Sequence, residues 1–260
     1  TLPIFSGVNA ARETICDRTM PYDGRTMRWT RLAWMAALCL WSLEAQEWRH
    51  WGGDAGGARY SSLKQINRRD VSKLRPAWTY RTGEQSDGSK LPYRSTFEST
   101  PLIAGGVMYL TTPFANLVAL DPETGRELWK FDAQLDREHI SGGLYINRGA
   151  AYWTDGAKQR LLVGTLDGRL WSIDAATGKP DPRFGVNGVV DLRDGVAGRF
   201  PRHRLGRSSP PAIYKNLAIC GSIVPDGEAH GPAGDVRAYD VLTGKLAWQF
   251  HTVPHPGEFG

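Results

Sequence analysis

The stretch Val118-Ala-Leu-Asp-Pro-Glu-Thr-Gly-Arg-Glu-Leu-Trp-Lys-Phe131 decides the fold, because the chain repeats it. The same pattern returns as Trp171-Ser-Ile-Asp-Ala-Ala-Thr-Gly-Lys-Pro-Asp-Pro-Arg-Phe184 and as Arg237-Ala-Tyr-Asp-Val-Leu-Thr-Gly-Lys-Leu-Ala-Trp-Gln-Phe250. Each copy has an alternating strand, the turn Asp-x-x-Thr-Gly and a second strand. Self-similarity at a spacing of about 50 to 65 residues indicates a repeat architecture.

The turn of each copy begins with an aspartate and ends with a glycine. The aspartate side chain can accept hydrogen bonds from backbone N–H groups within the turn, and glycine adopts the positive φ that the turn requires. Trp129 and Trp248 lie at matching places on the outgoing strands, where we expect them to wedge between neighbouring sheets. The second copy has Pro180-Asp-Pro182 there, so we expect its outer strand to be irregular. The turn residues are Asp121, Gly125, Asp174, Gly178, Asp240 and Gly244.

Each copy is preceded by further strands. The hairpins expected from the sequence pair 101–104 with 107–112, 160–165 with 169–174, and 212–214 with 217–222. About four antiparallel strands per repeat make a propeller blade, so the fold class is all-β, a β-propeller. We expect three blades, over roughly 98–131, 149–184 and 208–251. Residues 74–80 read as an outgoing strand without partners before it. Closed propellers have about four to eight blades, so we expect the N-terminal part of a longer protein.

The composition agrees with short strands and tight turns. The chain has 260 residues with 30 Gly, 16 Pro and 10 Trp, which disfavours a helical bundle or coiled coil. The net charge of +5 is mild and no Lys/Arg block stands out, so nucleic acid is not an expected partner. The three cysteines cannot make a disulfide framework over this length.

The first 45 or so residues differ from the rest. Residues 1–26 are expected to be a non-structural upstream segment, because they show no periodicity. Residues 27–45 have a basic start, an apolar run and an approximate cleavage site, the layout of a secretory signal peptide, with an uncleaved anchor as the alternative. Residues 46–260 are assigned to the partial propeller. Cleavage leaves Cys220 as the single thiol, which we expect to be a buried strand residue.

Several local motifs resemble the quinoprotein alcohol and sugar dehydrogenases. They are Trp48-Arg-His-Trp-Gly-Gly-Asp54, Phe97-Glu-Ser-Thr-Pro-Leu102, Asn147-Arg-Gly-Ala-Ala-Tyr-Trp153 and the terminal His251-Thr-Val-Pro with Pro256-Gly-Glu-Phe-Gly260. The resemblance runs from about Trp48 to Gly260. It implies an eight-bladed propeller that holds pyrroloquinoline quinone (PQQ), usually with Ca²⁺, on its axis. The terminal motif resembles the sugar and polyol branch.

The resemblance implies a role for individual residues of this sequence that match the family's motifs. Glu98 matches a carboxylate that contacts the cofactor. Arg148 matches the arginine beside the ortho-quinone oxygens, where a guanidinium stabilises the reduced form. Ser208 matches a hydroxyl that bonds a cofactor carboxylate, and Ser209 is an equal alternative. Read without the resemblance, Glu98 is a solvated loop residue, Arg148 a surface ion pair and the two serines a plain turn.

The metal and the catalytic base are less well specified. Asp226 or Glu228 aligns near the first calcium-binding carboxylate, and Ca²⁺ prefers oxygen ligands. The six histidines show no metal-ligand spacing, so we expect no zinc site. Gly142-Gly143 stands where alcohol-oxidising members often carry a vicinal cysteine pair, which argues against a methanol-type site. The catalytic aspartate of the family lies in a later blade, so no base is assigned.

The resemblance implies a periplasmic PQQ-dependent dehydrogenase that oxidises an aldose or polyol of the glucose type by hydride transfer. Its partners would be the substrate and a quinone or cytochrome electron acceptor, with a possible association with the inner membrane. The alternative is a non-enzymatic propeller of the same repeat type that acts as an outer-membrane assembly or binding scaffold, because the turns serve only the fold. A third reading is a truncated, inactive product.

Overall fold

The computed structural model describes residues 47–226 and 230–259. The expected upstream segment and signal peptide therefore lie outside the described residues. The chain divides into two compact units, and the larger contains residues 47–61 and everything described from Arg75 onward. Within the described ranges, no helix has the length and apolar character needed to cross a membrane.

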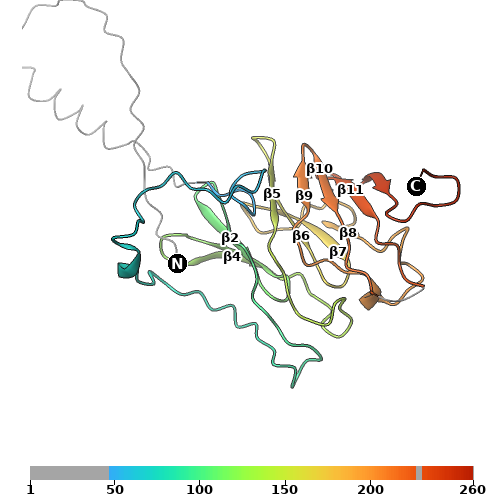
Figure 1. Cartoon of the computed structure of the whole chain (residues 1–260), viewed down its shortest axis with the longest axis horizontal. Helices are drawn as coiled ribbons and strands as arrows, with labels where there is room; N and C mark the ends of the chain where they lie inside the picture. Colours follow the sequence, from blue (N-terminus) through green and yellow to red (C-terminus); the bar gives the residue numbers. More distant parts are fainter. Residues whose placement is uncertain (1–46, 227–229, 260) are drawn as a thin grey trace, which may run out of the picture. The chain divides into compact units, whose positions relative to one another are not determined.

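The larger unit consists of three four-stranded antiparallel sheets, each a meander in chain order (Figure 1). They are propeller blades, as the sequence predicts. The first contains β1 (Leu102–Ala104), β2 (Val107–Thr111), β3 (Leu117–Leu120) and β4 (Glu127–Phe131). The second contains β5 (Ala151–Thr154), β6 (Gln159–Gly164), β7 (Arg169–Asp174) and β8 (Val189–Asp191). The third contains β9 (Ala212–Tyr214), β10 (Leu217–Cys220), β11 (Val236–Asp240) and β12 (Leu246–Phe250).

The repeated turns have the hydrogen bonds that the sequence predicts. In the first, Asp121 Oδ1 accepts from the backbone N–H groups of Glu123 at 3.0 Å and Thr124 at 3.1 Å. The Gly125 N–H closes the turn on the Asp121 carbonyl at 2.8 Å. Gly125, Gly178 and Gly244 have φ of +71°, +69° and +70°. The three turns are therefore structural copies of one another.

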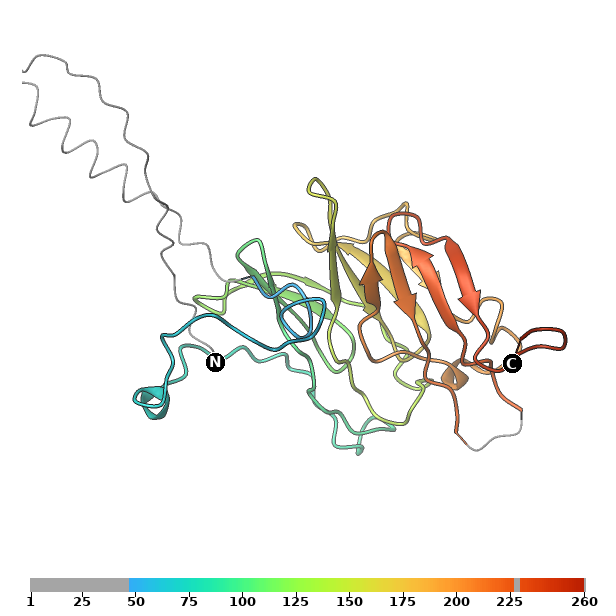
Figure 2. The ribbon, with the colours of Figure 1, turned by 45° about the horizontal axis from the view of Figure 1, so that its top comes forward.

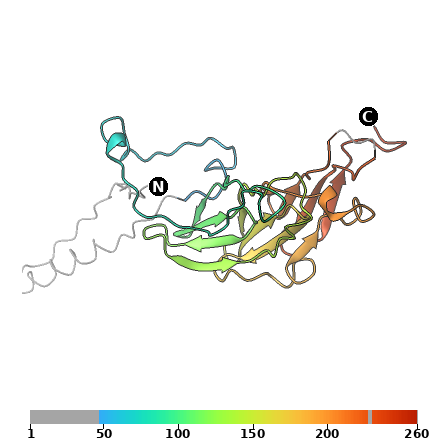
Figure 3. The same ribbon diagram turned by 90° about the horizontal axis from the view of Figure 1, so that it is seen from below.

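The blades pack face to face, as the succession of green, yellow and orange sheets shows (Figures 2 and 3). One core lies between the first two blades and includes Tyr109, Leu117 and Leu161. A second core lies between the second and third blades and includes Phe184 and Cys220. Cys220 is 2% exposed, which confirms the prediction of a buried strand thiol, and burial raises its pKa.

Tryptophans on one segment bind the turn of the next blade. The Trp129 indole N–H donates to the Ala175 carbonyl at 3.2 Å, and its ring lies over Gly178. Trp78 binds the first blade in the same way, because its N–H donates to the Pro122 carbonyl at 3.0 Å. The contact of Trp129 confirms its predicted wedge position, whereas Trp248, the other predicted wedge, is 40% exposed. Residues 75–80 nevertheless form no strand, so that part of the prediction is wrong, and Trp78 is held through its side chain.

The second blade departs from the repeat, as its Pro-Asp-Pro sequence predicts. The chain forms no strand directly after Pro180, and the outer strand begins only at Val189. The Gly185 N–H donates to the Thr243 carbonyl at 2.9 Å, so a backbone hydrogen bond joins the second blade to the turn of the third. Asp181 turns inward and is 4% exposed, where it binds buried Arg160 at 2.6 Å.

One face of the third blade is exposed among the described residues. Trp248 pairs with Ala238 across the ladder at the position that corresponds to Trp129 beside Ala119. Leu246, Trp248 and Phe250 are 51%, 40% and 63% exposed. This apolar row on β12 is equivalent to the face of the first blade that contacts the second.

Residues 62–74 belong to the second unit. They contain a short 3₁₀ helix, η1 (Val71–Lys73). Asp70 precedes this helix, and its two carboxylate oxygens accept from the backbone N–H and the side-chain amide of Asn67, each at 2.7 Å.

The contact between Gly178 of the second blade and the Trp129 ring of the first blade gives a stability prediction. Gly178→Ala is expected to destabilise the protein by about 2–4 kcal/mol, because it adds a positive-φ strain to the overpacking of a tight contact. The added Cβ would lie 2.6 Å from two ring carbons of Trp129. Urea unfolding measures the effect. Gly156→Ala is the control, since its φ is +93° with open space around the site. Equal losses of unfolding free energy in the two variants would show that the contact between Gly178 and Trp129 contributes nothing to stability.

Candidate functional site

Three of the predicted site residues meet at the loops before the first strands of the three blades. Arg148 Nε lies 3.2 Å from Glu98 Oε2, and Arg148 Nη1 donates to Ser208 Oγ at 2.7 Å. The Ser208 residue is 3% exposed, whereas the side chains of Arg148 and Glu98 are 46% and 40% exposed. The structure therefore joins one residue from each blade into a single polar cluster, here called the Arg148 cluster (Glu98, Arg148 and Ser208).

The backbone fixes this arrangement. The Arg148 N–H donates to the Ser208 carbonyl at 2.7 Å, and the Thr100 N–H donates to the Arg148 carbonyl at 3.2 Å. These two bonds link the loops of the three blades in order. Gly149 has a φ of +130°, and a Cβ there would lie 3.2 Å from the Thr100 carbonyl oxygen. A side chain at Gly149 would therefore push the first loop away from Arg148.

Two buried neighbours position the cluster, and neither is among the sequence-predicted site residues. Asn147 is 1% exposed, donates from Nδ2 to the Gly164 carbonyl at 2.8 Å and accepts from the Gly149 N–H at 3.1 Å. Arg207 is also buried and donates to the carbonyls of Gly221 and Pro210. Asn147 stands in the quoted Asn-Arg-Gly motif. Arg207 carries no local signal, because its partners are backbone carbonyls brought close by the fold.

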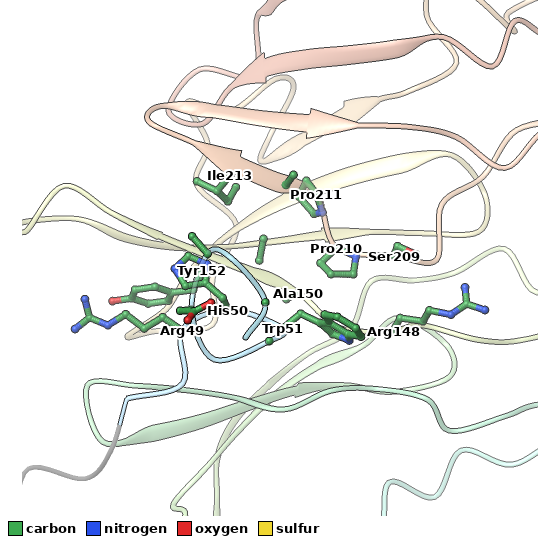
Figure 4. Close-up of a pocket in the computed structure, with 16 residues that line it drawn as sticks. Arg49, His50, Trp51, Arg148, Ala150, Tyr152, Ser209, Pro210, Pro211 and Ile213 are labelled. Carbon is green, nitrogen blue, oxygen red and sulfur yellow. The ribbon is translucent and has the colours of Figure 1, made fainter. Parts of the chain in front are cut away.

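A pocket of about 440 Å³ lies beside the cluster, between residues 49–57 and the first strands of the second and third blades (Figure 4). Trp51, Tyr152, Pro210 and Pro211 give it largely apolar walls. Arg148 lines one edge, and its guanidinium points away from the pocket interior (Figure 4). Ser209 also lines the pocket and is exposed, so the two candidate serines have different surroundings.

The predicted metal ligands are not joined to this cluster by any contact that the described residues show. Asp226 is exposed on the loop after β10, and Glu228 lies outside the described residues. Ca²⁺ takes six to eight oxygen ligands, which one exposed carboxylate does not supply. The calcium assignment thus stays a prediction. Gly142 and Gly143 have φ of +86° and +65°, a conformation that L side chains rarely adopt.

Residues 48–259 match the family described as glucose/ethanol/alcohol dehydrogenase, β-propeller domain, of the PQQ type. The chain belongs to this family of quinoprotein dehydrogenases. It is 36% identical to the quinate/shikimate dehydrogenase (quinone) of Acinetobacter baylyi, covering 78% of this chain and 27% of that protein. It is 33% identical to quinoprotein glucose dehydrogenase A of Acinetobacter calcoaceticus, covering 79% and 28%.

Solved structures show the same fold. The quinohemoprotein alcohol dehydrogenase from Comamonas testosteroni superimposes with a TM-score of 0.65 at 29% identity, over 84% of this chain and 29% of that one. The quinohemoprotein alcohol dehydrogenase ADHIIG from Pseudomonas putida gives a TM-score of 0.61 at 34% identity, over 80% and 27%. The chain therefore spans between a quarter and a third of the length of these relatives.

Proposed function

We propose that the chain is part of an exported PQQ-dependent dehydrogenase that oxidises an aldose or polyol and passes the electrons to a quinone or cytochrome. The observation that carries the proposal is the Arg148 cluster, in which three blades each contribute one polar side chain. A non-enzymatic propeller that acts as a scaffold does not require polar side chains from three blades to meet at one place. Export to the periplasm rests on the signal-like residues 27–45 and belongs to the proposal.

The donor set of the cluster fits PQQ. The cofactor presents carboxylates and carbonyl oxygens, and Arg148 and Ser208 offer charged and neutral donors. Glu98 accepts from Arg148 Nε and so holds the guanidinium in one orientation. When bound, PQQ accepts a hydride from the substrate carbon. Arg148 would place its positive charge where negative charge develops, and Ser208 would fix the cofactor.

The substrate class rests on two observations. By the resemblance, Gly142 and Gly143 stand where alcohol-oxidising members often carry a vicinal cysteine pair, and both adopt positive φ. Two relatives are named for glucose and for quinate and shikimate, which are rings carrying several hydroxyl groups. Both favour a ring polyol over methanol. Ca²⁺, with Asp226 or Glu228 among its ligands, is the proposed metal, and no step is derived from it.

The test is reconstitution of the full-length protein that contains this chain with PQQ and Ca²⁺, followed by a dye-linked assay, because the family's catalytic aspartate is expected in a later blade. Binding is measured first, from the change in PQQ absorbance on titration with protein. Turnover is then compared among glucose, quinate, glycerol, ethanol and methanol. We expect PQQ binding and preferential oxidation of glucose or quinate. Preference for methanol or ethanol would contradict the substrate class, and no turnover with bound PQQ or an absence of binding would favour the scaffold.

A further inference from the structure

The segment that follows β12 brings together two histidines and a glutamate. His251, His255 and Glu258 each offer one ligand atom, and these three atoms all lie within 4.8 Å of one another. The residues come from the eight-residue loop His251-Thr-Val-Pro-His-Pro-Gly-Glu258. From the sequence we expected no histidine-based metal site. The loop nevertheless folds back so that residues three, four and seven positions apart converge.

The two imidazoles and the carboxylate are already mutually oriented. His251 Nδ1 lies 2.7 Å from Glu258 Oε1. The rings of His251 and His255 are stacked with their centroids 3.8 Å apart. The backbone N–H of His255 donates to Glu258 Oε2 at 2.8 Å, which closes the loop and leaves Oε1 toward His251.

A buried carboxylate lies near the other nitrogen of the His251 ring. Asp235 Oδ2 is 3.9 Å from His251 Nε2, whereas Glu258 contacts Nδ1. Asp235 is 4% exposed and is held by the side-chain amide of Gln249 at 2.7 Å and the N–H of Thr252 at 3.3 Å. Histidines that bind metals usually direct their second ring nitrogen toward such a carboxylate, which orients the ring and raises its basicity.

We propose that His251, His255 and Glu258 form a divalent transition-metal site, with Zn²⁺ as the expected ion and Asp235 as the residue that positions His251. Two imidazole nitrogens, one carboxylate oxygen and a water complete the tetrahedral set that Zn²⁺ prefers. Imidazole selects zinc and its neighbours in the first transition row over Ca²⁺ and Mg²⁺. The site is independent of the Arg148 cluster and of the proposed dehydrogenase activity.

The test uses the untagged, metal-stripped full chain titrated with Co²⁺, whose visible absorption reports coordination geometry, and with Zn²⁺ by calorimetry. We expect one equivalent of tightly bound metal and a tetrahedral Co²⁺ spectrum without the near-ultraviolet charge-transfer bands of a thiolate. His255→Ala and Glu258→Gln should each weaken binding at least tenfold, and Asp235→Asn about 10- to 100-fold. Both loop substitutions are at exposed residues, so folding is checked simply by circular dichroism.

His203→Ala is the matched control, because His203 is an exposed histidine on a different segment, η2 (Arg202–Arg204). Its affinity should equal that of the unsubstituted protein. The proposal is overturned if no stoichiometric binding occurs, if His255→Ala and Glu258→Gln bind as tightly as the unsubstituted chain, or if His203→Ala loses affinity to the same extent. Thiolate charge-transfer bands would also overturn it, since they would place the metal on cysteine.

Discussion

Asp181→Ala is expected to destabilise the protein by about 3–5 kcal/mol, because it leaves the guanidinium of Arg160 buried without its principal partner. Arg160 is 4% exposed and contacts Asp181 Oδ2 through Nη2 at 2.6 Å and through Nε at 3.0 Å. Its remaining carboxylate contact is Asp174 Oδ2, which lies 2.8 Å from Nη1. Urea unfolding measures the loss of stability. The dependence of the free energy of unfolding on urea concentration should be the same for both proteins.

Two further variants separate the buried charge from other effects. Arg183 also binds Asp181 but is mostly exposed, so Arg183→Ala should change stability much less. The double variant Arg160→Met/Asp181→Ala removes both charges and should recover most of the stability lost in the single variant, because an apolar pair replaces a buried ion pair at little cost. A double variant as unstable as Asp181→Ala alone would contradict the assignment to an unpaired charge.

The same carboxylate gives a pH dependence. The pKa of Asp181 is held well below its ordinary value of 3.8, first by the Arg183 side chain and also by Arg160. A depressed pKa stabilises the folded state above the unfolded-state pKa, and this stabilisation is lost as the pH falls toward the folded-state pKa. The stability difference between the unsubstituted protein and Asp181→Asn should therefore be constant near neutral pH and shrink below about pH 4. Urea midpoints between pH 7 and 2.5 measure it, and a constant difference would contradict the shift.

In the PQQ-reconstituted full-length protein, Arg148→Ala is expected to lower turnover by about 10²- to 10³-fold, the usual effect of removing one preorganised donor from developing charge. The substitution removes the guanidinium that joins Glu98 to Ser208. Arg148→Lys keeps the charge without the planar fork, so an intermediate loss is expected. Turnover is measured in the dye-linked assay, and PQQ affinity in a parallel titration.

Arg126→Ala is the control for this prediction. Arg126 is an exposed arginine whose nearest carboxylate, on Asp121, is 3.8 Å away. It lies in the outer turn of the first blade, and its removal should leave turnover unchanged. Turnover and PQQ affinity that are the same in Arg148→Ala as in the unsubstituted protein would remove Arg148 from the site.

The repeated part of the fold could be predicted from the sequence because its determinants are local. Asp121 and Gly125 lie within one turn, so residue type and spacing alone indicate the geometry. The wedge position of Trp129 also follows from the repeat, whereas Trp248 at the matching position is 40% exposed. The strand expected around Trp78 does not form, because pairing depends on a neighbouring strand and not on the residues of that segment alone.

The site was predictable only as far as the family motifs reach. Glu98 and Arg148 were identified by resemblance, and the structure adds that they are in contact. Asn147 and Arg207 act by binding backbone carbonyls of other segments, which residue type does not reveal. His251 and Asp235 are 16 positions apart in sequence. Their proximity likewise depends on the path of β11 and β12. Such contacts follow from tertiary packing and not from local pattern.

The exposed apolar row on β12 also indicates what kind of segment can pack against the third blade. Leu246, Trp248 and Phe250 present a flat apolar strip of the kind that sheet proteins normally conceal. The three Asp-x-x-Thr-Gly turns of the chain are already occupied, by Trp78, by Trp129 and by the segment at Gly185. A further blade with a turn of this type could accept the Trp248 indole as the second blade accepts Trp129. Burial of the row against such a blade would stabilise the third blade by the hydrophobic effect.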